Sequence, residues 1–106
     1  MGGMSCNEMS LVPWQILKKA SNCCASISDK NIAKTVAGFK DKKFSKTSIT
    51  GGEGATPGII ALVGICNNKK ARKLINLDEN SNVLVIGCEG NADVKLYKQL
   101  LSKGRK

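Results

Sequence analysis

Apolar residues follow one another without a polar face at residues 59–66. The apolar residues of this run are Ile59, Ile60, Leu62, Val63, Ile65 and Cys66. The preceding Thr56 and Pro57 offer an N-cap and a first helical position, so the pattern predicts a helix beginning there or slightly earlier, at Gly54. A helix that is apolar all round is normally buried. We expect this helix to need more cover than a chain of 106 residues can provide.

A second continuous apolar run, Val-Leu-Val-Ile at residues 83–86, predicts a buried strand. Such runs are typical of parallel strands covered on both faces. The short, small-residue run at 23–27 predicts a second, brief strand. Because ligands of open α/β sheets gather at the carboxyl ends of strands, we expect the turn at 87–90 to contribute to a site.

Three other segments show apolar positions at helical spacing. The helices are expected to begin after Ser10, after Ser28 with Asp29, and after Asn91 or Asp93. Their inward residues are Leu11, Trp14 and Leu17, then Ile32, Val36 and Phe39, then Val94, Tyr97, Leu100 and Leu101. Residues 67–75 predict a short, basic, exposed helix, and residues 40–48 predict a surface loop.

Together these elements predict an α/β fold in which helices flank a small parallel sheet. The length of 106 residues suits one domain, spanning residues 1–106. No amino-terminal signal peptide is evident, and no apolar run is long enough to cross a bilayer, so we expect no membrane partner.

The formal net charge of +9 raises the question of a nucleic-acid partner. The basic residues are nearly all lysines, spread singly or in pairs such as Lys18-Lys19 and Lys69-Lys70, and aromatic stacking platforms are missing. We therefore expect a solvated, lysine-rich surface rather than nucleic-acid binding.

The cysteines form no C-x-x-C pair, and the chain has no histidine to complete a zinc set. They are Cys6, Cys23, Cys24, Cys66 and Cys88. We expect no metal site and interpret the protein as cytoplasmic, with free thiols.

The glycine-rich stretch Gly51-Gly-Glu-Gly54 precedes the apolar helix. It lacks the spacing of a dinucleotide fingerprint and the ending of a P-loop, and Glu53 would repel a phosphate beside it. Two interpretations remain: a plain structural turn, or a loop whose glycines admit a flat ligand and whose carboxylate is stabilised by the helix dipole.

Several motifs together resemble the carboxyl-terminal portion of diaminopropionate ammonia-lyases. They are Cys-Asn-Glu at 6–8, Trp-Gln-Ile-Leu at 14–17, Thr-Gly-Gly-Glu-Gly-Ala at 50–55, Leu-Asp-Glu-Asn-Ser at 77–81, the apolar run at 83–86, and Glu-Gly at 89–90. The resemblance covers nearly the whole chain in order. It implies part of a larger pyridoxal-phosphate-dependent fold, of the fold type II class that includes tryptophan synthase β and threonine dehydratase.

The resemblance implies an α,β-elimination that converts 2,3-diaminopropionate to pyruvate and ammonia, with the cofactor as electron sink. It also implies that the glycine loop and the turn after the last strand approach pyridoxal phosphate. The residues so implied are Gly52, Glu53, Gly54, Gly87, Cys88 and Glu89. Cys6 and Glu8 are implied on the substrate side, and the full enzyme is expected to be a homodimer. Glu53, Glu89, Cys6 and Glu8 each also have a purely structural interpretation.

Two departures from the family pattern stand out. Gly87 and Cys88 occupy positions where the family tends to have Ser-Thr, so a thiol would replace the hydroxyl beside the ring nitrogen. No segment matches the family's Schiff-base lysine or its phosphate loop, and Lys18, Lys19 and the other lysines lie in exposed-looking settings. We therefore expect the chain alone to be catalytically incomplete and to require the amino-terminal portion of the enzyme.

Other interpretations remain open at this stage. Within the same cofactor class the chain could belong to a threonine or serine dehydratase-like or threonine synthase-like relative. A stand-alone basic binding or interaction module is the alternative from another class. The chain could be an excised domain, a truncated or split product, or a complete small protein.

Overall fold

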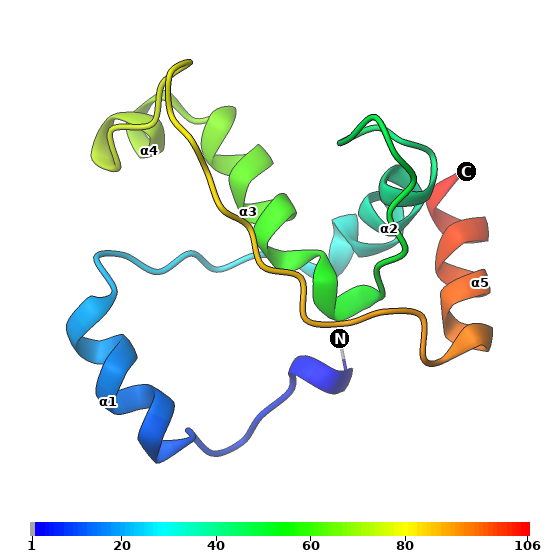
Figure 1. Cartoon of the computed structure of the whole chain (residues 1–106), viewed down its shortest axis with the longest axis horizontal. Helices are drawn as coiled ribbons and strands as arrows, with labels where there is room; N and C mark the ends of the chain where they lie inside the picture. Colours follow the sequence, from blue (N-terminus) through cyan, green and yellow to red (C-terminus); the bar gives the residue numbers. More distant parts are fainter. Residues whose placement is uncertain (1) are drawn as a thin grey trace.

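The structure, a computed structural model, describes residues 2–106. These residues form helices only, in the order η1 (Gly2–Met4), α1 (Leu11–Ala20), η2 (Asp29–Asn31), α2 (Ile32–Lys40), η3 (Glu53–Ala55), α3 (Pro57–Cys66), α4 (Lys69–Leu74) and α5 (Val94–Gly104). In Figure 1, α2 and α5 lie side by side, α3 leads outward to α4, and α1 lies apart from the other helices.

The core lies between α2 and α5. Ile32 and Val36 of α2 and Tyr97 of α5 are buried together, and they are partly covered by Ile60, Leu100 and Leu101. Apart from Ile60, these are inward positions that the helical spacing predicted, but Val94, which was also predicted to face inward, is 51% exposed. Asp93 caps α5, accepting a hydrogen bond from the N–H of Leu96 over 2.8 Å, which confirms one of the two predicted caps.

The predicted α/β fold with a parallel sheet is wrong, because no strand is found among residues 2–106. Residues 83–86 are extended, but they run beside α3 (Figure 1), whose backbone groups already bond within the helix. Val85 meets α3 closely, since a Cβ on Gly58 would lie 2.5 Å from its Cγ1. Leu84 and Ile86 are 87% and 74% exposed, so alternate side chains face outward as in a strand that lacks a partner.

The other predicted strand, at residues 23–27, is also wrong, since it is an unpaired connection between α1 and η2. A strand requires a neighbouring backbone to supply hydrogen bonds, and within the described part of the chain neither segment has one.

The apolar helix α3 forms as predicted, with Pro57 in its first turn, but none of its residues is buried. The expectation that the chain cannot cover it is therefore confirmed. The helix α1 is less covered still, since all of its residues are exposed. The prediction that Leu11, Trp14 and Leu17 face inward is therefore wrong within this chain. Within residues 2–106, no helix is long and apolar enough to cross a membrane.

Candidate functional site

The glycine loop and the turn at 87–90 lie against each other. The N–H of Gly52 donates to the backbone oxygen of Glu89 over 3.0 Å, and the N–H of Gly54 donates to its carboxylate Oε2 over 2.6 Å. The resemblance implied that both segments approach one ligand, and the structure brings them together. We call this arrangement the glycine clamp, made of Gly52, Gly54 and Glu89.

Both glycines of the clamp are required by its close packing. A Cβ on Gly52 would lie 2.3 Å from the backbone oxygen of Gly90, and a Cβ on Gly54 would lie 2.4 Å from Glu89 Oε2. Neither separation is possible for non-bonded atoms. A side chain at Gly52 would therefore force the two backbones apart, and one at Gly54 would displace the Glu89 carboxylate from its hydrogen bond.

The carboxylate of Glu89 lies close to the start of the apolar helix. It accepts a hydrogen bond from the N–H of Gly54, a residue of η3, and η3 directly precedes Thr56 and α3. Thr56 is fully buried and its hydroxyl donates to the backbone oxygen of Glu53 over 2.7 Å. The Glu53 side chain instead accepts from the N–H of Gly2 over 2.9 Å. The dipole argument made for Glu53 therefore applies to Glu89.

Beside the clamp is a hollow of about 310 Å³, which we call the clamp hollow. It is lined by Phe39, Ile49, Thr50, Gly51, Ala55, Ile59, Val85, Gly87 and Glu89. Apolar side chains and glycine backbone form most of its wall, and Glu89 is its one charged lining residue. Such a wall suits a flat ring bearing a hydrogen-bond donor.

Phe39 and Ile49 were not predicted as site residues. The N–H of Ile49 donates to the backbone oxygen of Phe39 over 3.0 Å, which fixes the loop before Thr50 to the end of α2. A Cβ on Gly51 would lie 3.2 Å from the Phe39 ring. Phe39 was predicted as an inward residue, but its helical spacing did not indicate which segment it meets.

The remaining predicted site residues lie elsewhere. Cys6, Glu8 and Cys88 are exposed and do not line the clamp hollow, although Cys88 adjoins Gly87, which does. No lysine or arginine is among the lining residues. All five cysteines are free.

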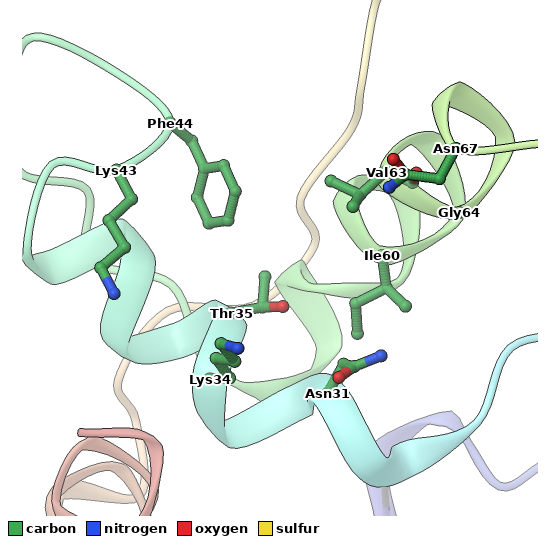
Figure 2. Close-up of a pocket in the computed structure, with 9 residues that line it drawn as sticks. All are labelled: Asn31, Lys34, Thr35, Lys43, Phe44, Ile60, Val63, Gly64 and Asn67. Atoms are coloured by element: carbon green, nitrogen blue, oxygen red, sulfur yellow. The ribbon is translucent and has the colours of Figure 1, made fainter. Parts of the chain in front are cut away.

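A larger hollow of about 470 Å³ lies between α2, α3 and the turn after α2, and we call it the α2–α3 hollow. Figure 2 shows Ile60 and Val63 of α3 on one side of it, and Phe44 across from them on the same side as Lys34 and Lys43. The α2–α3 hollow is larger than the clamp hollow and, within residues 2–106, shares no lining residue with it. No motif in the sequence predicted the α2–α3 hollow.

Comparison with known proteins supports the resemblance. The chain is 28% identical over 109 residues to a diaminopropionate ammonia-lyase of Salmonella typhimurium, covering 99% of this chain and 27% of that protein. It is 26% identical over 108 residues to the diaminopropionate ammonia-lyase of Escherichia coli K12, with the same coverage. The chain thus spans about a quarter of the length of these curated relatives, which is consistent with a carboxyl-terminal portion. No family model and no solved structure matches it.

Proposed function

We propose that this chain is the carboxyl-terminal portion of a pyridoxal-phosphate-dependent diaminopropionate ammonia-lyase, and that its glycine clamp forms one wall of the cofactor site. The observation that carries the proposal is the pair of hydrogen bonds from Gly52 and Gly54 to Glu89. It joins the two motifs, 35 residues apart at Gly54 and Glu89, that the similarity to ammonia-lyases marks.

The residues present fit the cofactor ring but not the whole cofactor. The clamp hollow offers an apolar wall from Phe39, Ile59 and Val85, and Gly51 and Gly87 line it without side chains. The carboxylate of Glu89 would repel the phosphate, and the lining holds no cation to bind it. The phosphate site and the Schiff-base lysine therefore belong to the amino-terminal portion in this proposal.

When bound, pyridoxal phosphate withdraws electrons from the substrate, so that the α-proton and the β-amino group of 2,3-diaminopropionate can leave. The contribution of this chain is to orient the ring and to exclude water from one face. The fixed carboxylate of Glu89 holds the glycine loop against the turn. Cys88 is exposed beside Gly87 and would have to turn toward the hollow to offer the ring nitrogen a weak hydrogen-bond partner. In this proposal Cys6 and Glu8, which are exposed in this chain, belong to the substrate side of the full enzyme.

The amino-terminal portion is the partner that this proposal requires. Three apolar surfaces lack cover: α1, α3 and the extended residues 83–86. Their exposed members include Leu11 at 78%, Leu84 at 87% and Ile86 at 74%. Exposed apolar surface of this extent is expected at an interface. In the full enzyme, which we propose to be a cytoplasmic homodimer, these surfaces pack against the remaining three quarters of the fold, except for the side of α3 that lines the hollow toward α2.

The experiment is to purify the native protein that carries this chain from its source cell and determine its intact mass, bound cofactor and activity. We expect a longer polypeptide, or a complex with a second one, that contains pyridoxal phosphate and releases pyruvate from 2,3-diaminopropionate. A native protein without the cofactor would contradict the proposal. Activity on threonine or serine alone would keep the cofactor class and replace the substrate.

Within that protein, Glu89→Gln removes the charge that holds the glycine loop. We expect weaker cofactor binding, because a hydrogen bond to a charged acceptor contributes about 1.5–3 kcal/mol. Glu79→Gln is the matched control, since Glu79 is an exposed acid outside both the clamp and the hollow.

A further inference from the structure

A strongly basic hollow of about 340 Å³ lies at the carboxyl-terminal end of α5. Six cationic side chains line it: Lys30, Lys34, Lys43, Lys103, Arg105 and Lys106. They come from the start of α2, the turn after α2, and the end of α5. Residues that the sequence scatters singly therefore converge at one place, which we call the basic hollow.

The floor of the basic hollow is made of small residues. A Cβ on Gly104 would lie 2.0 Å from the backbone oxygen of Ala33 and 2.9 Å from the Cβ of Ala37. The two helices therefore touch backbone to backbone at this crossing. Since Ala33 and Gly104 add almost no side-chain volume, the long lysine side chains surround an open space.

The positive charge of the basic hollow is only partly neutralised. Arg105 pairs with Asp41, its Nη2 and Nε lying 2.6 and 3.1 Å from the two carboxylate oxygens. This hydrogen bonding holds the pKa of Asp41 below its ordinary range. Asp29, next to Lys30 in the chain, is a second acid near the hollow. Among the described residues, no acid lines the hollow itself. The negative end of the α5 dipole opposes anion binding, but five lysines outweigh a partial charge.

The basic hollow adjoins the α2–α3 hollow, because Lys34 and Lys43 line both. On the far side of these lysines the lining becomes apolar, with Phe44, Ile60 and Val63 (Figure 2). The ring of Phe44 is held edge-on against Phe39, with centroids 5.7 Å apart, and remains 43% exposed. A ligand that spans both hollows needs several negative charges at one end and a flat, weakly polar ring at the other.

We propose that these two hollows bind a nucleoside triphosphate, with its phosphates in the basic hollow and its base against Phe44. Flexible ammonium groups act as point charges for phosphate oxygens, and an aromatic ring stacks on a base of any identity. A nucleic-acid duplex fits less well, because the cations converge on a hollow and form no stripe along the surface.

This site is separate from the clamp hollow and does not depend on the proposed lyase function. The basic hollow and the clamp hollow share no lining residue among the described residues. The clamp adjoins the amino-terminal end of α5, near Asp93 and Tyr97, whereas the basic hollow lies at the other end. A helix of 11 residues spans roughly 16 Å between them.

The test is a binding titration of the native protein with ATP, inorganic triphosphate and adenosine, without metal ions. We expect ATP to bind more tightly than either part alone, and amide shifts on ATP addition to concentrate at Lys34, Phe44 and residues 103–106. The double variant Lys103→Glu and Lys106→Glu should weaken ATP binding by on the order of tenfold or more, because it reverses two charges of the hollow.

The control is Lys69→Glu with Lys70→Glu on α4, which changes the net charge equally away from the hollow. We expect it to alter ATP affinity by less than about twofold at physiological salt. Equal losses in both double variants would overturn the proposal, as would triphosphate binding as tightly as ATP without shifts at Phe44. Preferential binding of duplex DNA would overturn it in favour of a nucleic-acid surface. Every readout is either ATP binding or an amide shift. The outcome therefore tests the nucleotide site without depending on whether the protein has lyase activity.

Discussion

The carboxylate of Glu89 accepts a hydrogen bond from the backbone N–H of Gly54 over 2.6 Å, across 35 residues of sequence. The same glutamate accepts from Gly52 through its backbone oxygen. One residue of the turn therefore anchors both glycines of the clamp, Gly52 and Gly54. This relationship explains why the loop is rich in glycine without a left-handed glycine conformation, since no described glycine has a positive φ.

Substituting Gly54 by Ala should destabilise the chain. The new Cβ would meet Glu89 Oε2 at 2.4 Å, so the carboxylate must move and its bond to the loop is lost. We expect a loss of about 1–3 kcal/mol in the free energy of unfolding, measured by urea denaturation.

Gly64→Ala is the matched control for that substitution. Gly64 lies within α3, and a Cβ there would meet nothing within 4 Å. Because alanine is the better helix former, we expect this variant to gain about 0.5–1 kcal/mol. A Gly54→Ala chain as stable as the parent would show that the clamp is not formed in solution.

The ion pair between Asp41 and Arg105 should make stability depend on pH in acid. The hydrogen bond from Arg105 lowers the pKa of Asp41 in the folded chain, so the pair stabilises fully above the unfolded-state pKa of about 3.9. The stabilisation is lost as the pH falls through the lower, folded-state pKa. We expect Asp41→Asn to flatten the fall of the urea midpoint below about pH 4.

Glu79→Gln serves as the control for Asp41→Asn, because it removes an exposed acid that no ion pair holds in the described structure. It should leave the acid-induced fall of the midpoint intact. If Asp41→Asn and the parent chain lost stability in parallel on acidification, the ion pair would make no contribution to folding.

Local signals in the sequence predicted the helices well and the sheet badly. The cap at Asp93 and the apolar spacing of Ile32, Val36 and Tyr97 depend on neighbours within one or two helical turns, and these were correct. The run at 83–86 is as apolar as a buried strand, but a strand also requires a partner backbone. Within residues 2–106 the extended run meets α3 instead, so composition alone predicted the wrong structure.

The candidate site was predictable where motifs carried it. The resemblance placed Gly52, Gly54 and Glu89 near one ligand, and the structure brings them together. Phe39 and Ile49 were not predicted because a loop without apolar period connects them. The basic hollow was missed for a similar reason: its cations lie in separate segments, and only the crossing of α2 and α5 gathers them.

The extended residues 83–86 should be unprotected in this chain by itself. They lack strand pairing within the described residues, and Leu84 and Ile86 are largely exposed. We expect their amides to exchange with solvent far faster than those of α5, as measured by hydrogen exchange. Native full-length protein should protect them, because the proposed amino-terminal portion covers these exposed apolar side chains. Equal protection in both samples would contradict that cover.

Two helices end in the same backbone motif but with different residues at its left-handed position. After α2, the N–H of Lys43 donates to the oxygen of Gly38 over 2.8 Å, and Lys42 has a φ of 60°. After α4, the N–H of Leu77 donates to the oxygen of Arg72 over 2.9 Å, and Asn76 has a φ of 53°. Asparagine tolerates this conformation better than lysine, so strain is concentrated at Lys42.

Replacing Lys42 by Gly should therefore stabilise the chain. Glycine adopts a positive φ without steric cost, and relief of the left-handed lysine is expected to add about 1 kcal/mol to the free energy of unfolding. The equivalent change Asn76→Gly, at a position already held by a tolerant residue, should alter stability by only a few tenths of a kcal/mol. Thermal melts of both variants beside the parent measure the difference. A Lys42→Gly chain that melts below the parent would mean that the lysine side chain contributes more than its backbone strain costs.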